Sequence, residues 1–159
     1  MKYSVAVIPG DGIGPIVVEA ALKVLGTLSK LFSVDIDFKV LEAGDETKKQ
    51  SGTALPDLTL EGVRASHACL KGPIGETARE VVLPLRQKLD LYANIRPAKT
   101  LPNIPSAVKG VDLVVVRENT EGLYKGIEDK TSDYSFSVRV ITKRCSSRIA
   151  NVAYETALY

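Results

Sequence analysis

The chain has 159 residues, of which 45% are hydrophobic and 25% charged, a balance that predicts one ordinary globular domain or two small ones. Its formal net charge of +2 gives no nucleic-acid footprint, and its apolar stretches are far shorter than a membrane span. One histidine excludes a His-rich metal site, and the widely spaced Cys69 and Cys145 favour reduced thiols in a cytoplasmic protein.

The first half of the chain alternates between strand and helix patterns. Residues 3–8 are apolar and rich in β-formers, and residues 34–40 alternate as a strand with one solvated face. Residues 16–32 have helical spacing, with Pro15 near the first turn, where its missing N–H costs nothing. Shorter patterns predict a helix at 58–64, a buried strand at 68–70 and a helix at 80–89 that Pro84 kinks or starts late.

The second half continues the alternation after a proline-rich interval. Residues 91–95 are strand-like, and residues 97–110 are the best candidate for a domain boundary or crossover. Residues 111–116 predict a buried strand and residues 136–142 an alternating one. A final helix is predicted with Ser146 or Ser147 as its cap. The order of elements predicts an α/β fold.

Residues 9–15, PGDGIGP, form a glycine-rich turn between a strand and a helix. Gly10, Gly12 and Gly14 give G-x-G-x-G, but Pro15 stands where the dinucleotide fingerprint G-x-G-x-x-G needs its third glycine. The turn therefore does not predict a Rossmann site. Two interpretations stay open: a turn that requires positive φ, and a turn that a ligand approaches by another geometry.

This turn, together with LKGPIGE, LRQKLDLYANIRPAK and VRENTEGLYKGIE, resembles the isocitrate and 3-isopropylmalate dehydrogenase family, most closely its archaeal 3-isopropylmalate branch. The resemblance covers essentially the whole chain but only the N-terminal half of the family. It implies an open α/β sheet with helices on both faces, truncated here. The implied reaction is oxidation of a 3-carboxy-2-hydroxy acid by NAD, or NADP, followed by loss of CO₂. A divalent cation, Mg²⁺ or Mn²⁺, is implied as well.

The resemblance also assigns the site residues. Because a malate core carries two carboxylates, rigid bidentate cations suit it, and Arg86, Arg96 and Arg117 match the substrate arginines of the family. Tyr124 matches the tyrosine that helps protonate the enolate, whereas Asn119 and Glu121 are assigned to local hydrogen bonding. The implied cofactor-binding residues are Ile8, Gly72, Pro73 and Ile74.

The helix before Arg86 sets substrate selectivity in this family. Isocitrate enzymes place a serine and an asparagine where this chain has Glu80, which would repel a third carboxylate, and Val82, which cannot hydrogen-bond one. Leu83 stands where homoisocitrate enzymes can carry an arginine. Val82 and Leu83 suit an isopropyl group, so 3-isopropylmalate is favoured. Isocitrate and homoisocitrate stay open, because Arg79 would bring a cation to the pocket mouth.

The chain departs from the family pattern in two places. Ile16 replaces the glutamate that follows Pro15, and the chain stops at Tyr159, before the catalytic lysine, the metal-binding aspartates and the adenine-binding loop. We therefore expect residues 1–98 to form the N-terminal part of the first domain and residues 99–159 the incomplete start of the second, which carries the dimerisation arm. We expect no metal site in this chain and no turnover by the chain alone.

Two other functions stay open: a non-catalytic binding or regulatory subunit, and a folded remnant without a ligand. Retention of the three arginines and Tyr124 together argues against the binding or regulatory subunit, because such a subunit is free to lose Tyr124. The expected partner is a small carboxylic acid, with neither nucleic acid nor membrane. The resemblance implies a homodimer, because the alternating Tyr134, Phe136 and Val138 are similar to the intersubunit arm of the family.

Overall fold

The computed structural model describes residues 2–158, and the chain forms two compact units that divide between Leu85 and Arg86. The expected division after residue 98 falls inside a strand of the second unit. The assignment of these segments to the domains of the complete family fold stays a prediction.

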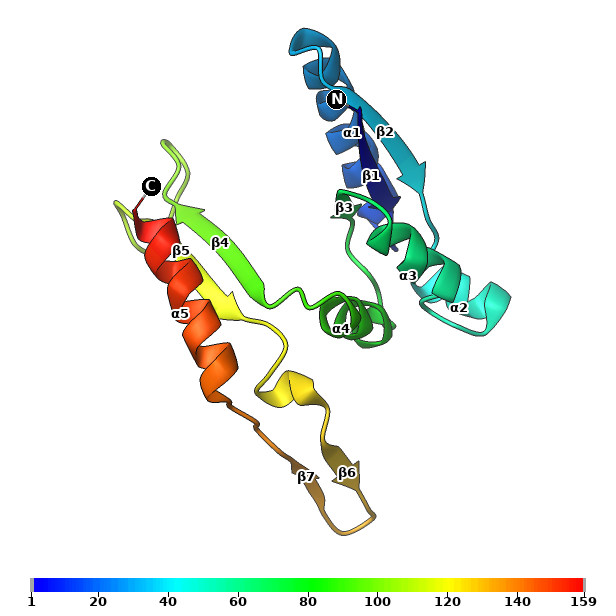
Figure 1. The fold of residues 1–159 in the computed structure, drawn as a ribbon, viewed down its shortest axis with the longest axis vertical. Helices are drawn as coiled ribbons and strands as arrows, with labels where there is room; N and C mark the ends of the chain where they lie inside the picture. The colour runs from blue at the N-terminus through cyan, green and yellow to red at the C-terminus, as the bar shows by residue number, and fades with distance from the viewer. Residues whose placement is uncertain (1, 159) are drawn as a thin grey trace. The chain divides into compact units, whose positions relative to one another are not determined.

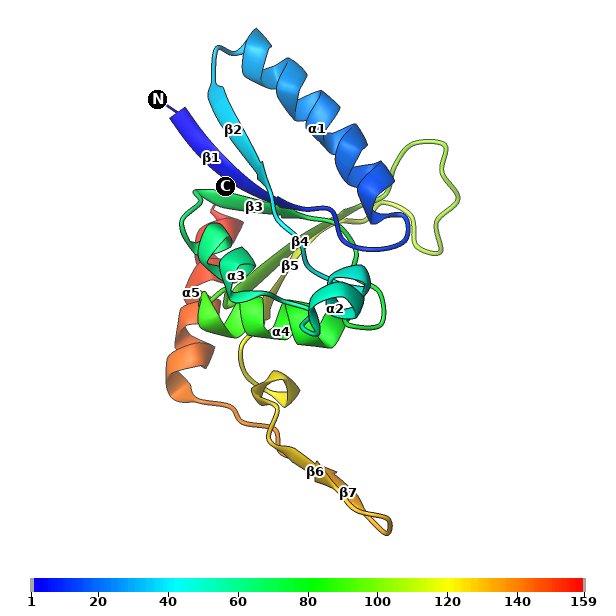
Figure 2. The same ribbon diagram turned by 90° about the vertical axis from the view of Figure 1, so that its right-hand side faces the viewer.

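The first unit is an α/β layer built on a parallel sheet with the strand order β2-β1-β3 (Figure 1). One helix connects β1 to β2, and two shorter helices connect β2 to β3. Helix α1 lies along β2, and α3 contacts β1 (Figure 2). The elements are β1 (Lys2–Ile8), α1 (Gly14–Leu31), β2 (Asp35–Val40), α2 (Asp45–Ser51), α3 (Asp57–Arg64), β3 (Ala68–Lys71) and α4 (Ala78–Lys88). The last residues of α4, from Arg86 on, belong to the second unit.

The core of this unit lies at the end of the central strand, where Ala6, Val7 and Ile8 are 0% exposed. A parallel strand between two neighbours can bury both faces, which accounts for its unbroken apolar run. The helices contribute further buried apolar side chains: Val18, Leu60, Val63, Val81 and Leu85. Since the strands are parallel, their carboxyl ends meet at one edge of the sheet, and the loops that follow them lie together there.

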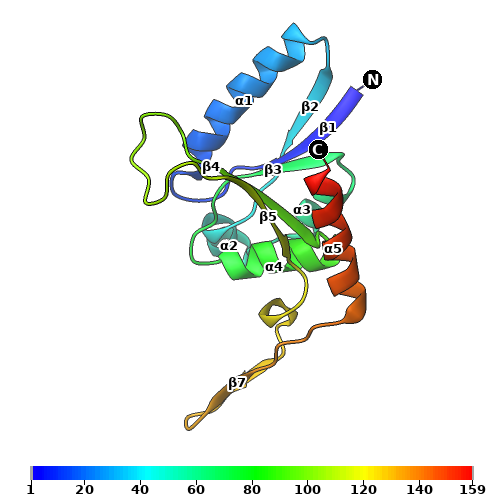
Figure 3. The same cartoon turned by 90° about the vertical axis from the view of Figure 1, so that its left-hand side faces the viewer.

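The second unit is mainly antiparallel, with a separate hairpin and a long helix that packs along β5 (Figure 1). Strands β4 and β5 form a two-stranded ribbon. Beyond β5 the chain forms a short 3-10 helix, η1, and the hairpin of β6 and β7 (Figure 3). The elements are β4 (Ala93–Lys99), β5 (Asp112–Glu118), η1 (Leu123–Lys125), β6 (Glu128–Lys130), β7 (Ser135–Ser137) and α5 (Lys143–Ala157).

The α/β expectation is confirmed, but two strands predicted to be buried are largely exposed. β3 lies at an edge of its sheet, and only Leu70 within it is half-buried. In β5 the consecutive residues Leu113, Val114 and Val115 are 48%, 45% and 48% exposed, so both faces of the strand stay about half exposed although α5 packs along it. Apolar content indicates what a strand is able to bury, whereas its position in the sheet decides what it does bury.

The proline-rich interval is not a crossover. β4 extends through Pro97 to Lys99, and the loop that follows closes an antiparallel pair running from Ala93 opposite Glu118 to Lys99 opposite Asp112. Proline is tolerated in β4 because that strand has β5 as its single neighbour, so one side of it needs no ladder hydrogen bonds.

The last predicted strand and the last helix cap also differ in the structure. β7 covers only Ser135–Ser137, and Val140 forms an isolated bridge with Gly122. The N-cap of α5 is Thr142, whose hydroxyl accepts a 3.2 Å hydrogen bond from the Cys145 N–H, so neither Ser146 nor Ser147 caps the helix. Within residues 2–158, no helix combines the length and apolarity needed to cross a membrane.

Candidate functional site

The ribbon of the second unit places two predicted substrate arginines on one face. Arg117 is opposite Asn94, and Arg96 is opposite Val115, so Arg96 and Arg117 are diagonal neighbours whose side chains leave the same face. Arg96 is exposed, and its Nε donates a 3.1 Å hydrogen bond to Asn94 Oδ1. The ribbon therefore presents two arginine side chains on one face.

Tyr124 joins this arrangement through η1. The Arg117 guanidinium donates a 2.6 Å hydrogen bond to the Tyr124 hydroxyl, and its Cζ lies 5.1 Å from the centre of the ring. Arg86, from the last turn of α4, places its Cζ 5.8 Å from the same ring. Three of the residues that the resemblance assigned separately thus form one cluster.

Gln87 fixes Tyr124 from its backbone side. Its side-chain amide donates a hydrogen bond of 2.5 Å to the Tyr124 carbonyl oxygen, which ties η1 to the end of α4. Sequence reasoning missed Gln87, although its position beside Arg86 in the LRQ motif was a signal. Arg86 and Gln87 are adjacent in the chain, and both contact Tyr124.

A pocket of about 450 Å³ opens beside Arg117 and Tyr124. Both arginine and carboxylate groups line it, together with apolar side chains that would suit a small organic acid with a hydrocarbon part. Arg139, which the sequence analysis did not select, contributes a further cation. The lining residues are Arg117, Glu118, Glu121, Gly122, Leu123, Tyr124, Arg139, Ile141, Ser146 and Ile149.

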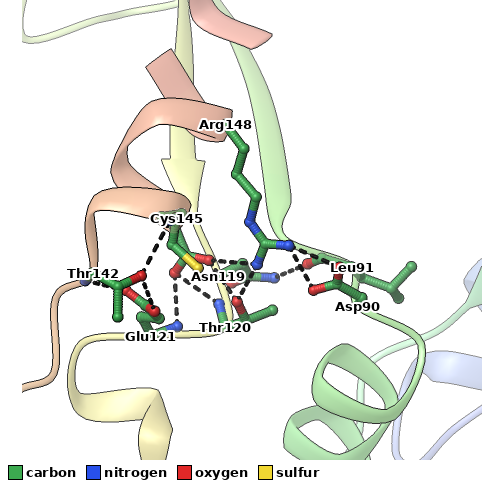
Figure 4. A network of polar contacts seen from close by, with 9 residues as sticks. Asp90, Leu91, Asn119, Thr120, Glu121, Thr142, Cys145 and Arg148 are labelled. Atoms are coloured by element: carbon green, nitrogen blue, oxygen red, sulfur yellow. Dashed lines mark hydrogen bonds and ion pairs between the residues drawn. The ribbon is translucent and has the colours of Figure 1, made fainter. Parts of the chain in front are cut away.

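The turn between β5 and η1, whose Thr120 and Glu121 are labelled in Figure 4, is organised by the Glu118 carboxylate. It accepts hydrogen bonds from the backbone N–H groups of Thr120 and Glu121, at 2.9 and 2.7 Å, and from the Thr120 hydroxyl at 2.6 Å. Burial alone would raise the pKa of Glu118. These hydrogen bonds, with a smaller contribution from Arg148, outweigh burial, and the pKa is lowered. The carboxylate is therefore held ionised as a structural anchor.

Glu121 and Asn119 have local roles, as the sequence analysis assigned them. The Glu121 carboxylate accepts hydrogen bonds from the hydroxyl and backbone N–H of Thr142, at 2.7 and 2.9 Å (Figure 4). The Thr142 hydroxyl is the largest of the influences that lower the pKa of Glu121. Asn119 is buried, and its amide donates a long 3.5 Å hydrogen bond to the Leu91 carbonyl. Both residues connect the turn to neighbouring elements.

The selectivity residues lie on α4. Val82 and Leu83 are half-buried and stand one helical turn before Arg86. Glu80 forms a 2.7 Å ion pair with Lys48 of α2. This pairing offsets part of the Glu80 charge that was expected to repel a third carboxylate. Selectivity for an isopropyl group at this helix therefore depends mainly on Val82 and Leu83.

The proposed cofactor residues belong to the first unit, at the carboxyl edge of its sheet. Pro73 is exposed and Ile74 half-buried, while Gly72 is buried and Ile8 fully buried. The Gly72 N–H donates to the Ile8 carbonyl at 2.8 Å, and the Asp11 N–H donates to the Pro73 carbonyl at 2.9 Å. Ligands of open α/β sheets bind outside the carboxyl ends of the strands, and Pro73 and Ile74 are accessible there.

The glycine turn is explained by packing against this same loop. Gly10 has a φ of +75°, and a Cβ there would lie 2.0 Å from the Pro73 carbonyl oxygen. A Cβ on Gly14 would lie 2.3 Å from the carbonyl oxygen of Pro9. Positive φ and close backbone approach account for these two glycines without a ligand, so the structural interpretation of the turn is the one that the geometry supports.

Two aspartates connect the loops at this edge. The Asp11 carboxylate accepts from the backbone N–H groups of Asp45 and Gly75, each at 3.0 Å. Asp45 in turn accepts from Glu76 N–H at 3.0 Å, and from the N–H and hydroxyl of Thr77 at 2.8 and 2.6 Å. The Thr77 hydroxyl is the largest cause of the lowered pKa of Asp45. The loop after β3 is thereby held at both ends.

Metal-ligating side chains do not gather anywhere in the part of the chain that the structure describes: residues 2–158 contain no group of three or more His, Cys, Asp or Glu able to hold an ion. The residues present therefore do not fit a divalent metal centre.

Comparison with known proteins adds three findings. The family model "Isocitrate/isopropylmalate dehydrogenase" matches residues 4–159. The 3-isopropylmalate dehydrogenase of Saccharolobus solfataricus is 50% identical, over 99% of this chain and 47% of its own length. The isocitrate/homoisocitrate dehydrogenase of Thermus thermophilus is 42% identical, over 99% of this chain and 47% of its own length. A crystal structure of isocitrate dehydrogenase from Methylococcus capsulatus superposes with a TM-score of 0.83 at 41% identity, over 98% of this chain and 47% of that one. The chain spans about half the length of the curated relatives it matches.

Proposed function

Since the chain belongs to the isocitrate/isopropylmalate dehydrogenase family, we propose that the complete protein is a decarboxylating dehydrogenase of a 2-hydroxy acid that carries a carboxylate on C3. The observation that carries this proposal is the cluster in which Arg117 donates a 2.6 Å hydrogen bond to Tyr124 while Arg86 lies over the same ring. This cluster combines cations for carboxylates with a hydroxyl that can transfer a proton.

The arginines bind and orient the substrate. Arg96 and Arg117 leave the same face of the ribbon, where their planar guanidinium groups can each engage a carboxylate through two hydrogen bonds. Arg86 approaches from α4. Fixing both carboxylates in this way holds the C2–C3 bond in one orientation, which lowers the entropic cost of reaching the transition state.

Tyr124 is the proposed proton donor to the enolate carbon left after CO₂ departs. Arg117 contributes the hydrogen bond that fixes the direction of the Tyr124 hydroxyl. General acid catalysis requires such a group within hydrogen-bond reach of the atom that receives the proton. Because Gln87 holds the Tyr124 carbonyl, the phenol is positioned from both its hydroxyl and its backbone end.

NAD or NADP, when bound, supplies the hydride acceptor. We propose that Pro73 and Ile74 contact it, because they are the accessible members of the loop at the carboxyl edge of the sheet. Ile8 and Gly72 support that loop from the core. The proposed requirement for Mg²⁺ or Mn²⁺ has no ligand set within residues 2–158, so no step is assigned here to a metal-bound group.

The proposed substrate is 3-isopropylmalate. The half-buried Val82 and Leu83 offer apolar surface one turn from Arg86, and burying an isopropyl group of similar size stabilises by roughly 1.5–3 kcal/mol. Three relatives named 3-isopropylmalate dehydrogenase are 45–50% identical. Isocitrate or homoisocitrate is the second candidate. It is favoured by the Lys48–Glu80 ion pair and by the 42% identity to the Thermus enzyme. We further propose a cytoplasmic homodimer.

The test is a steady-state assay of the complete protein with 3-isopropylmalate, isocitrate and homoisocitrate. Each acid is tested with NAD and with NADP at one Mg²⁺ concentration, and NAD(P)H is followed by absorbance. We expect the highest kcat/KM with 3-isopropylmalate. A double variant, E80S/V82N, should lower that value and raise the one for isocitrate. Formation of NAD(P)H with none of the three acids would overturn the enzyme proposal, and a preference for isocitrate would overturn only the substrate.

A further inference from the structure

We infer that Arg148 is a positioning residue, which holds the turn after β5 in the shape that brings Arg117 onto Tyr124; this inference rests on the proposed function. Arg148 projects from α5 (Figure 4). Its side chain is only 17% exposed. It contacts neither Arg117 nor Tyr124 in any of its hydrogen bonds or ion pairs among the described residues, so its effect passes through the turn.

One edge of the Arg148 guanidinium holds the turn itself. Nη2 donates a 2.8 Å hydrogen bond to the Thr120 hydroxyl and lies 3.4 Å from Glu118 Oε1. Thr120 and Glu118 are the two residues whose mutual hydrogen bonds shape the turn. Glu118 is the immediate neighbour of Arg117, and its side chain is 19% exposed. Arg148 is therefore a cation that pairs with the largely buried Glu118 carboxylate.

The other edge anchors the same guanidinium to the connection between α4 and β4. Nη1 lies 2.8 Å from both carboxylate oxygens of Asp90, and Cζ lies 4.1 Å from the centre of the Tyr92 ring. Arg148 thus ties three segments together: α5, the turn after β5, and the connection that follows Arg86 and Gln87. Arg86 lies in α4 just before that connection, and Tyr124 lies in η1 just after the turn, so the tie holds the two segments that adjoin them.

Only an arginine can make this set of contacts. Two carboxylates, one hydroxyl and one aromatic face surround a planar fork, whereas a lysine ammonium offers a single compact point of contact and does not stack. Arg148→Lys should consequently keep the charge and still loosen the turn. This sets Arg148 apart from Arg144, which is exposed one turn earlier on the same helix and serves as the matched control.

The experiment is a double-mutant cycle in the complete protein. In the wild-type background we expect Arg148→Ala and Arg148→Lys to lower kcat by about tenfold to a hundredfold, because small misplacements of reacting groups are costly, and Arg144→Ala to leave it unchanged. In a Tyr124→Phe background the same Arg148 changes should lower kcat less than about twofold, since there is no phenol left to position. An equal fold-loss in both backgrounds would show a merely structural role and overturn the inference.

A second readout does not depend on activity. The protein is labelled with 3-fluorotyrosine, and the ¹⁹F resonance of Tyr124 is identified as the one missing from Tyr124→Phe. Arg148→Lys should move this resonance, and Arg144→Ala should leave it in place. An unmoved Tyr124 resonance would overturn the inference even if kcat falls. If the wild-type protein oxidises none of the three acids, the proposed function fails, and the resonance still decides whether Arg148 positions Tyr124.

Discussion

Tyr124 carries the hydroxyl to which the protonation step is assigned. Changing it to phenylalanine in the complete protein removes this hydroxyl and keeps the ring that Arg86 and Arg117 face. We expect kcat to fall by about a hundredfold or more, as general acid–base groups contribute, with a much smaller change in KM. The measurement is a set of initial rates against substrate concentration. Tyr154→Phe, at an exposed position, is the control, and an unchanged kcat in Tyr124→Phe would exclude Tyr124 as the acid.

Glu118 predicts a pH dependence of stability. Its pKa in the folded protein lies below its ordinary value of 4.5, because hydrogen bonds to the carboxylate outweigh its burial. The ionised group therefore stabilises the fold fully above about pH 4.5, and this contribution is lost as the pH falls through the lower folded value. Glu118→Gln should be less stable than wild type at pH 7, and the difference should shrink as the pH falls below 4.5.

Urea unfolding at a series of pH values checks this expectation. Glu19→Gln is the comparison for an exposed carboxylate: the ion pair with Lys23 on the same helix also lowers the pKa of Glu19, so this variant should show the same pH trend at a much smaller size. A stability difference between wild type and Glu118→Gln that stays constant down to pH 3 would contradict the stated role of the carboxylate.

Three residues of the arginine–tyrosine cluster could be selected from the sequence, whereas Gln87, Arg139 and the residues that support the turn could not. Arg86, Arg117 and Tyr124 stand in motifs whose spacing resembles the family, and the structure brings them together. Arg148 and Asp90 are far apart in the sequence and meet only through tertiary packing, which no local pattern encodes. Glu118 had a local signal, since a threonine two residues later can close a turn on its carboxylate.

At the scale of elements, the loops after β1 and β3 are packed backbone against backbone. A Cβ on Gly72 would lie 2.1 Å from the Pro9 carbonyl oxygen and 3.0 Å from a Val18 methyl. Gly72→Ala should therefore destabilise the protein by roughly 1–3 kcal/mol through overpacking. Gly26 lies inside α1 with open space around it, and Gly26→Ala should stabilise by about 0.5–1 kcal/mol.

Because Gly72→Ala and Gly26→Ala are expected to change stability in opposite directions, each variant serves as the control for the other. The measurement is thermal unfolding of both variants beside wild type. A Tm for Gly72→Ala equal to that of wild type would mean that the two loops can separate without cost. It would also weaken the proposal that Gly72 supports the loop on which Pro73 and Ile74 contact the cofactor.

Long periodic elements were predictable from sequence, and short or context-dependent ones were not. Helix α1 and strands β1 and β2 agree with the predicted ranges to within two residues, because α1 and β2 repeat one period over most of their length and β1 ends in an apolar run. Helix α2 has the sequence DETKKQS, which has no apolar face, and it depends on Asp11 accepting from its first N–H. Pro84 lies inside α4 rather than near its start, so buried Val81 and Leu85 outweigh the missing hydrogen bond.

At the scale of the whole molecule, we expect the 159-residue chain, purified by itself, to show no metal-dependent reduction of NAD or NADP. The described residues contain no ligand set for a divalent ion, and the apolar residues Leu113, Val114 and Val115 of β5 are about half exposed. The measurement is NAD(P)H formation with 3-isopropylmalate and Mg²⁺, with sedimentation to record self-association. Turnover by this chain at the rate of the complete protein would show that the second half of the family fold is dispensable.

The pairing of β4 with β5 determines which stretches of the chain between residues 93 and 118 tolerate insertions and deletions. Side chains alternate between the faces of a strand, so deleting one residue between Ala93 and Arg96 would send Arg96 to the face opposite Arg117. The connecting stretch at 100–111 lies outside the ladder and contributes no predicted site residue, so its length is free to change at little cost. Natural or engineered length variation should therefore accumulate in that stretch, and single-residue insertions within either strand should be selected against.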